Sequence, residues 1–421
     1  MNIYVETYGC TANKADEALL LGLLRQEHHT VVDALENADV VVLLTCTVIG
    51  TTEQRMLSRI KIFQKKQKKI IITGCMASAQ HDLIFSYEPN AILLPPQHIQ
   101  YINDVIKYDI FKGERKKFFS EKKTALPKYF TAAYAPIAIA KGCRLSCSYC
   151  ITRIARGKLR SFPIQDIITD VCSALRQGCK EIQLTAQDTA SYGLDSNTNL
   201  GTLLTQICAI QGAFRVRIGM MNPATTKKNL DAILAAYRHK KIYKFLHLPI
   251  QSGNDTILIL MNRGYTTDEF LTIINRFREK IPTLTLSTDV IVGFPTETDA
   301  QFDQTMQLIS KMRPDIINIT RFSARPQTPA KTMKGRVPTN IVKDRSQRVT
   351  KLCADLSLEK NQEHVGKTYT VLVTEKGKHK TFKGRTESYK QVVLREQVTL
   401  GTFVNTEIID AAQTYLVGKL I

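Results

Sequence analysis

Residues 142–163 read GCRLSCSYCITRIARGKLRSFP, and three cysteines fall within eight residues of this stretch. Cys143, Cys147 and Cys150 have the spacing C-x₃-C-x₂-C. Such a loop can supply thiolates to three irons of a cubane iron–sulfur cluster, whereas a fully cysteine-ligated cluster takes four. One iron would then stay open to a ligand with an amine and a carboxylate, which is what S-adenosylmethionine offers.

Two other uses of a cysteine-rich loop fit this stretch less well. A structural zinc site takes four ligands, usually in two close pairs, but the flanking histidines are the distant His98 and His239. Disulfides are rare in cytosolic proteins, and the N-terminus MNIYVETYGC has a strand pattern instead of a secretion signal. An iron–sulfur cluster is therefore the preferred interpretation, with zinc as the alternative.

Length and composition predict a multidomain cytoplasmic protein. The chain has 421 residues with 43% hydrophobic content, which is enough for two or three domains with cores of their own. No run of about 18 uncharged apolar residues occurs, so we expect no membrane partner.

The net charge of +20 is concentrated in three basic runs and favours a polyanionic partner. Seven basic residues lie in 55–69, seven in 112–128 and nine in 321–351. A solvated face explains any one run, but three runs together indicate a nucleic acid.

The first 108 residues alternate apolar runs with amphipathic stretches, a rhythm that predicts a parallel sheet with helices on its faces. A cysteine follows each of three expected strands, which are Ile3–Thr7, Val40–Leu44 and Ile70–Thr73. Because parallel strands end along one edge of a sheet, Cys10, Cys46 and Cys75 should converge there. We interpret them as a second cluster site. The alternatives are three buried core cysteines and a flavodoxin-like nucleotide site, although Gly9-Cys10-Thr11 is a poor phosphate loop.

Residues 109–133 are basic and contain Gly113 and Pro127, as expected of a linker. The next block carries six β/α units, which predict a partial β/α barrel with its active site at the carboxyl ends of the strands. Its expected strands are one that ends at Lys141, then Glu181–Thr185, Val216–Met220, Phe245–Pro249, Ser287–Val292 and Ile316–Thr320. The cysteine loop follows the first of them.

Polar or glycine-containing turns follow the other strands of this block. Residues at such a rim are candidates for binding the cofactor, and here they are Gln187, Asn222, Gln251, Ser252 and Gly293. Ordinary turn chemistry is the alternative for each of them.

The last 56 residues carry five short expected strands, which indicate a small antiparallel barrel. It holds nine basic and five acidic residues, interleaved with Tyr369, Phe382, Tyr389 and Phe403. Basic side chains bind phosphates and exposed aromatics stack on bases, which favours RNA binding, although some of these aromatics must fill the core.

Taken together, the chain resembles the radical S-adenosylmethionine methylthiotransferases, which act on tRNA or on a ribosomal protein. The matching stretches include TYGCTANKAD, LTCTV, TGCM, GCRLSCSYCI and ARGKLRSFP. The resemblance implies an N-terminal methylthiotransferase domain (1–108), a linker (109–133), a radical core (134–360) and a TRAM-like RNA-binding domain (361–421). It also implies two 4Fe–4S clusters, an auxiliary one on Cys10, Cys46 and Cys75 and a radical one on Cys143, Cys147 and Cys150.

Within that family, FLHLPIQSGND, LMNRGYT and TDVIVGFPTET look most like the archaeal and eukaryotic branch. That branch acts on N6-threonylcarbamoyladenosine 37 of tRNA. We expect Tyr149 and Arg263, which lie in two of the matching stretches, to contact the cofactor. Leu44 and Ala186 depart from the usual Asn and Gly of the family, so packing around the auxiliary site can differ.

The resemblance implies that a 5′-deoxyadenosyl radical and a cluster-held sulfur together place a methylthio group at C2 of the adenine. An electron donor and a sulfur source are then required partners. The rival functions are a methylthiotransferase of another tRNA adenosine or of a ribosomal-protein aspartate. A rival of a different class is a non-catalytic iron–sulfur protein that binds RNA or transfers electrons.

Overall fold

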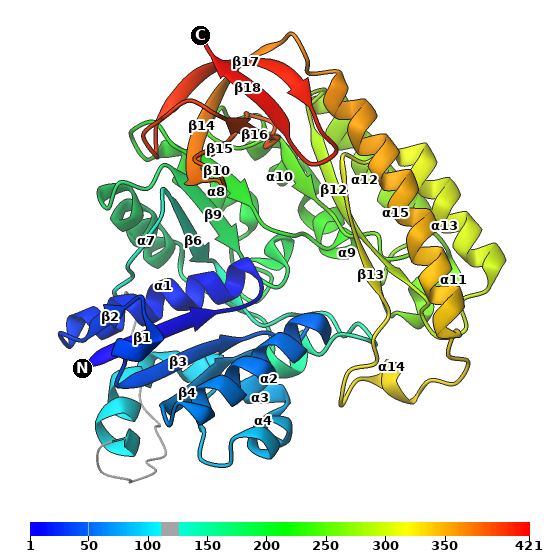
Figure 1. Ribbon diagram of the computed structural model, residues 1–421. Coiled ribbons are helices and arrows are strands. Elements are labelled where there is room, and N and C mark those ends of the chain that lie inside the picture. Colours follow the sequence, from blue (N-terminus) through cyan, green and yellow to red (C-terminus); the bar gives the residue numbers. More distant parts are fainter. Residues whose placement is uncertain (49, 111–125) are drawn as a thin grey trace.

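A computed structural model describes residues 1–48, 50–110 and 126–421. The N-terminal sheet lies at one end of the molecule, the central strands and helices lie in the middle, and the C-terminal barrel lies at the other end (Figure 1). Most of the expected linker, including most of the second basic run, lies outside the described residues.

The N-terminal part is a five-stranded parallel sheet with helices on both faces. The strand order is β2-β1-β3-β4-β5, and the strands are β1 (Asn2–Thr7), β2 (Thr30–Val32), β3 (Val40–Thr45), β4 (Lys69–Gly74) and β5 (Ile92–Leu94). The helices are α1 (Thr11–Gln26), α2 (Gly50–Lys65), α3 (Cys75–Ala79), α4 (His81–Tyr87) and α5 (Ile102–Val105). The predicted parallel sheet is confirmed.

The two faces of this sheet are built by alternation along β3, all of which is buried. Val40, Val42 and Leu44 pack with leucines of α1 on one face. Val41 and Leu43 pack with α2 and α4 on the other. A strand buried on both faces reads as a continuous apolar run, as this one does.

The central part has six main strands in two parallel three-stranded sheets, ordered β10-β9-β6 and β11-β12-β13. They are β6 (Tyr134–Ala138), β9 (Glu181–Thr185), β10 (Arg215–Ile218), β11 (Phe245–His247), β12 (Thr285–Val292) and β13 (Ile316–Arg321). A single bridge between Val216 and Ile242 joins the sheets. This is the expected partial barrel, with β10 and β11 as its middle strands.

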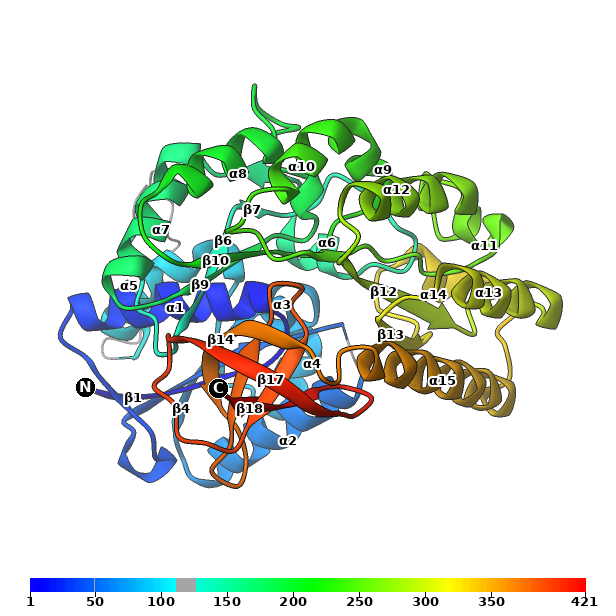
Figure 2. The same ribbon diagram turned by 90° about the horizontal axis from the view of Figure 1, so that it is seen from above.

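Helices cover the outside of these strands as an arc (Figure 2). The longer ones are α7 (Ile164–Arg176), α8 (Leu200–Ala209), α10 (Leu230–Tyr237), α12 (Thr267–Lys280), α13 (Asp299–Met312) and α15 (Thr339–Gln362), and the shorter ones are α6 (Thr152–Arg156), α9 (Pro223–Thr226), α11 (Asp255–Leu260) and α14 (Pro329–Thr332). A two-stranded hairpin, β7 (Ala140–Lys141) with β8 (Arg160–Ser161), closes the base of the cysteine loop. One large hydrophobic core joins the helices to the strands.

The C-terminal part is a closed five-stranded barrel in the order β14-β15-β16-β18-β17. Its strands are β14 (Thr368–Lys376), β15 (Phe382–Arg385), β16 (Gln391–Leu394), β17 (Phe403–Ala411) and β18 (Leu416–Leu420). The small barrel is confirmed, but β16 and β18 pair in parallel, so it is not antiparallel throughout. Tyr369 and Phe382 pack against its apolar core.

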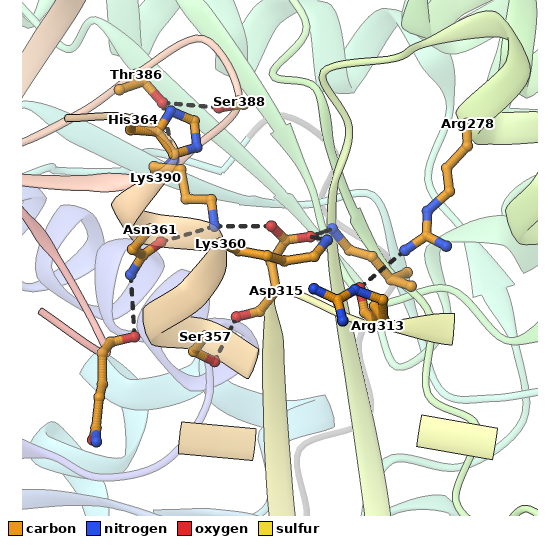
Figure 3. A network of polar contacts seen from close by, with 12 residues as sticks. Arg278, Arg313, Asp315, Ser357, Lys360, Asn361, His364, Thr386, Ser388 and Lys390 are labelled. Atoms are coloured by element: carbon orange, nitrogen blue, oxygen red, sulfur yellow. Dashed lines mark hydrogen bonds and ion pairs between the residues drawn. The ribbon is translucent and has the colours of Figure 1, made fainter. Parts of the chain in front are cut away.

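A buried polar network fastens this barrel to the central part (Figure 3). The carboxylate of Asp315 accepts from Lys390 of the barrel at 2.8 Å and from Lys360 of α15 at 3.2 Å. Lys390 also donates to Asn361 at 2.9 Å. Asp315 directly precedes β13, so the barrel is docked at the amino end of that strand.

A second contact places Tyr389 of the barrel against the same end of the strands. Its hydroxyl donates to Glu181, the first residue of β9, at 3.1 Å, and its ring packs on Tyr243 and Phe245. Tyr389 is therefore a docking residue, and it is not available to stack on a base.

None of the described helices has the length and apolar character needed to cross a bilayer.

Candidate iron–sulfur and cofactor site

The first cysteine trio lies on a compact loop between β7 and α6. The Cys143 amide donates to the Gly157 carbonyl at 3.1 Å, and the Cys150 amide donates to the Cys147 carbonyl at 3.1 Å. Gly142 has φ +72°, and a Cβ there would lie 2.0 Å from the Lys158 carbonyl oxygen, so this turn requires glycine. The loop follows the first strand of the barrel at its carboxyl side, as predicted.

The three thiols are partly buried, and burial raises the pKa of two of them. The pKa of Cys143 is raised to about 12, mainly by burial and to a smaller extent by the charges of Asp188, Cys150 and Cys147. Burial followed by the charge of Cys147 also raises the pKa of Cys150.

A cubane and a single ion place different demands on their ligands. Within the described ranges, no group of three His, Cys, Asp or Glu side chains converges on a point that one metal ion could occupy. A cubane spreads its irons among its ligands, so its cysteines need only surround a common space. Three cysteines on one loop match the ligand number of a cubane with one open iron, whereas a structural zinc site takes four ligands.

Arg263 lies beside this trio. Its guanidinium donates to the Cys147 sulfur at 3.3 Å and to the Tyr149 hydroxyl at 3.4 Å. Its Nε donates to the hydroxyl of Tyr265 at 3.1 Å. Arg263 is 6% exposed, so its charge is held close to the sulfur and away from water. The structure thus brings together two of the predicted cofactor residues, Tyr149 and Arg263.

Gln187 and Asn222 lie near a buried carboxylate, Asp188. The Oε1 of Gln187 is buried and has no hydrogen-bond partner among the described residues, which leaves it available to a ligand. Asn222 caps α9 through its side-chain oxygen, and its backbone N–H donates to the Asp188 carboxylate at 2.9 Å. Burial raises the pKa of Asp188 to about 6, although donors such as Thr225 lower it.

The other three predicted rim residues occupy strained or crowded turns. Gln251 has φ +72° and forms a backbone bridge to Val290, and the buried Ser252 accepts from the Asn254 amide at 3.3 Å. A Cβ on Gly293 would lie 2.4 Å from Val342 of α15. Turn geometry and helix packing account for these positions, and their contact with the cofactor stays a prediction.

The second cysteine trio lies at the carboxyl edge of the N-terminal sheet. Cys10 precedes α1, Cys46 follows β3, and Cys75 begins α3 directly after β4. Gly9 approaches Cys46 so closely that a Cβ would lie 2.7 Å from the Cys46 Cβ. Burial raises the pKa of Cys75 to about 11, and the charges of Cys10 and Cys46 contribute to that rise. The predicted convergence of the strand ends is therefore present.

The two sites are in contact through their helices. Cys75 and Ala79 of α3 share a buried cluster with Ile151 and Ala155, which flank and form α6. Because α3 begins at Cys75 and α6 begins two residues after Cys150, this packing fixes one trio relative to the other.

The sequence reasoning missed several polar residues around the two sites. Arg156, at the end of α6, is 5% exposed and forms an ion pair with Asp16 at 2.6 Å. Both residues lie in stretches that matched the family, but nothing in the sequence indicated that Arg156 and Asp16 meet. His247, which lies in the matching stretch FLHLPIQSGND, pairs with Asp289 at 2.9 Å.

The fold and the two trios define a radical S-adenosylmethionine protein, and comparisons with known proteins agree. A sequence profile of the radical SAM superfamily matches residues 137–309. Profiles of the uncharacterized protein family UPF0004 and of the TRAM domain match residues 2–94 and 362–421.

Full-length relatives identify the family. A probable threonylcarbamoyladenosine tRNA methylthiotransferase of Pyrococcus abyssi is 40% identical, with 100% of both chains covered. Its counterpart in Archaeoglobus fulgidus is 39% identical, with 100% of this chain and 99% of that chain covered. The Homo sapiens threonylcarbamoyladenosine tRNA methylthiotransferase is 31% identical over 99% of this chain and 73% of its own length. The chain belongs to the threonylcarbamoyladenosine tRNA methylthiotransferase family.

Solved structures support the fold. The radical S-adenosylmethionine methyltransferase TsrM of Kitasatospora setae, with cobalamin and a 4Fe–4S cluster bound, has a TM-score of 0.58 at 12% identity. The alignment covers 78% of this chain and 77% of that one. At this identity the likeness concerns the fold alone.

Proposed function

We propose that this enzyme replaces the hydrogen at C2 of N6-threonylcarbamoyladenosine 37 in tRNA with a methylthio group. The observation that carries the proposal is the direct packing of α3 on α6, which joins two cysteine trios in one chain. An enzyme that both activates a carbon and supplies a sulfur needs two such sites side by side.

The residues present fit two clusters. Cys143, Cys147 and Cys150 would hold the radical cluster, and Cys10, Cys46 and Cys75 the auxiliary one. With S-adenosylmethionine bound, the radical cluster supplies a 5′-deoxyadenosyl radical, which can act on a hydrogen that is neither acidic nor polarised. The protein contributes binding, orientation and the exclusion of water.

Several of this chain's residues would support that chemistry directly. Arg263 holds its positive charge at the Cys147 sulfur, and the half-buried Tyr149 hydroxyl is its neighbour. The orphaned Gln187 oxygen offers an acceptor for an amine or hydroxyl of the cofactor. In this proposal, all seven predicted cofactor residues contact S-adenosylmethionine. They are Tyr149, Gln187, Asn222, Gln251, Ser252, Arg263 and Gly293.

The C-terminal barrel would bind the tRNA. Its exposed basic residues include Lys376, Lys378 and Lys380 at the β14–β15 turn, where phosphates can reach them. The barrel docks at the amino ends of the strands, whereas the cysteine loop lies beyond their carboxyl side. An extended RNA is a partner that can contact both ends.

The domain borders 1–108, 134–360 and 361–421 and a cytoplasmic location belong to the same proposal, as do an electron donor and a sulfur source as partners. The profile matches at 2–94, 137–309 and 362–421 support the borders.

The test is mass spectrometry of tRNA nucleosides, with reconstituted enzyme and S-adenosylmethionine. We expect the methylthio derivative of threonylcarbamoyladenosine to form. A variant with Cys10, Cys46 and Cys75 changed to Ala should still release 5′-deoxyadenosine but yield no methylthio product. Product from that variant would contradict the role assigned to the second trio, and modification of a different adenosine would contradict the substrate.

A further inference from the structure

One arginine of the central part reaches into the N-terminal cysteine site. Arg156, the last residue of α6, donates from Nε toward the Cys75 sulfur at 3.5 Å. Its other nitrogens pair with the Asp16 carboxylate at 2.6 Å and donate to the Asn13 side-chain oxygen at 2.5 Å. A guanidinium can satisfy three groups at once because its donors point in fixed, divergent directions.

Asn13 connects Arg156 to the segments that carry Cys10 and Cys46. Its amide nitrogen donates to the carbonyl of Tyr8, two residues before Cys10, at 2.5 Å. The same nitrogen donates to the carbonyl of Thr45, directly before Cys46, at 2.8 Å. Through Asn13 and Cys75, Arg156 is thus linked to all three segments that carry the thiols.

A second arginine of the central part holds the chain that follows the thiols. Arg325, which is 6% exposed, donates to the Val48 carbonyl at 2.9 Å and pairs with Glu53 at 2.9 Å. Gln80, which follows α3, donates to the same Glu53 oxygen at 2.7 Å and accepts from the Thr47 hydroxyl. Segments just beyond Cys46 and Cys75 are therefore tied to the central part.

Ordinary interface ion pairs would not show this pattern. Burying a charge is unfavourable unless it is paired and hydrogen-bonded, so an interface has no general reason to place two buried arginines beside cysteines. Here both arginines end on segments within a few residues of a thiol, and one contacts a thiol sulfur directly.

We propose that Arg156 and Arg325 are positioning residues that complete the auxiliary cluster site, so that this site is composite and is tuned by the central part of the chain. The proposal rests on the assignment of Cys10, Cys46 and Cys75 as the ligands. A positive N–H donor at a ligand sulfur stabilises the reduced, more negative cluster and so raises its reduction potential. Arg325 keeps the ligand segments in place without touching a sulfur.

The experiment uses the full chain with Cys143, Cys147 and Cys150 changed to Ala, so that the measured iron and reduction potential belong to the auxiliary cluster alone. In this background, Arg156→Met, Arg156→Lys and Arg325→Met are reconstituted anaerobically. Iron content and the potential from a spectroscopic redox titration are then measured. Arg153→Met, on the same helix and with no side-chain contact to the site among the described residues, is the matched control. Circular dichroism verifies that each variant is folded.

We expect Arg156→Met to shift the potential to more negative values and Arg156→Lys to restore part of that shift. Arg325→Met should lose iron with little change in the potential of the cluster that remains. The double variant Arg156→Met/Asp16→Asn separates the lost donor from the unpaired carboxylate, and it should keep a negative shift.

The outcomes distinguish this inference from the ligand assignment. If the background protein with both arginines intact binds no iron, the assignment of the three cysteines fails. If it binds about four irons per chain and the arginine variants match Arg153→Met in iron content and potential, the composite site is refuted. A fully folded Arg156→Met/Asp16→Asn variant with an unchanged potential would also overturn the tuning role of Arg156.

Discussion

The guanidinium of Arg263 donates to the sulfur of Cys147 at 3.3 Å. These residues are far apart in the sequence, yet the arginine is almost completely buried at the cysteine loop. A hydrogen bond to a cluster ligand adjusts both the charge of the cluster and the orientation of the ligand.

Arg263→Gln should therefore impair cofactor cleavage. Outer partners of metal ligands are typically worth about 10- to 100-fold in affinity or activity, and we expect a loss of that order in 5′-deoxyadenosine release. The exposed Arg276→Gln is the control. If Arg263→Gln cleaves the cofactor at the wild-type rate, the contact has no role in the reaction.

The pair of Asp315 and Lys390 should hold the C-terminal barrel in place. Breaking a buried pair by removing one partner costs about 3–5 kcal/mol, so Lys390→Met should weaken docking and expose the junction near residue 362 to limited proteolysis. The Lys280→Met variant, which removes an exposed lysine, should not. Unchanged proteolysis of Lys390→Met would contradict the docking role.

The same pair predicts sensitivity to acid. Burial alone would raise the pKa of Asp315, but Lys390 and Lys360 outweigh it and lower that pKa. A depressed carboxyl pKa gives stability that is complete above the unfolded value of about 4 and is lost as pH falls through the lower folded value. Barrel docking should weaken below about pH 4, and Asp315→Asn should lose this dependence in a pH series of proteolysis rates.

Asp188 should affect stability in the opposite direction, with a contribution that decreases as pH rises. Burial raises its pKa to about 6, so the folded state binds a proton that the unfolded state releases. Its contribution to the free energy of unfolding should decrease as pH rises from about 4 to about 6, by on the order of 2 kcal/mol. Urea titrations of wild type and Asp188→Asn across this range should differ in slope, and parallel curves would refute the shift.

The basic turn between β14 and β15 should bind phosphates. Changing Lys376, Lys378 and Lys380 to Gln should weaken tRNA binding and reduce its salt dependence by about one unit of slope per lost contact. Arginine at all three positions keeps the charge and should retain binding. A glutamine variant that binds tRNA with the affinity and the salt slope of the wild type would exclude this surface.

The sequence predicted the strands that are buried on both faces, because β3 and β4 are continuous apolar runs. The short edge strands β2 and β5 were not predicted, since three residues give too little periodicity. The basic runs were partly misleading. Arg325 and Arg345 form buried ion pairs inside the protein, and neither faces a polyanion.

The positions of the six cysteines in the fold were predictable because each lies at a strand end or within a tight spacing. The residues around them were not, because their partners come from other domains. Arg156 lies within the first quoted stretch, but its contact with Asp16 depends on how α6 packs on α3. Gly293 was predicted as a cofactor residue, whereas its neighbour Val342 shows that helix packing alone already requires glycine there.

Iron stoichiometry tests the central claim most directly. Wild-type protein, the variant without the first trio and the variant without the second trio are reconstituted anaerobically and assayed for iron. Two independent sites predict about eight irons per chain in the wild type and about four in each variant. Either variant with the full wild-type iron content, or a wild type that binds only one cluster, would contradict the two-cluster account.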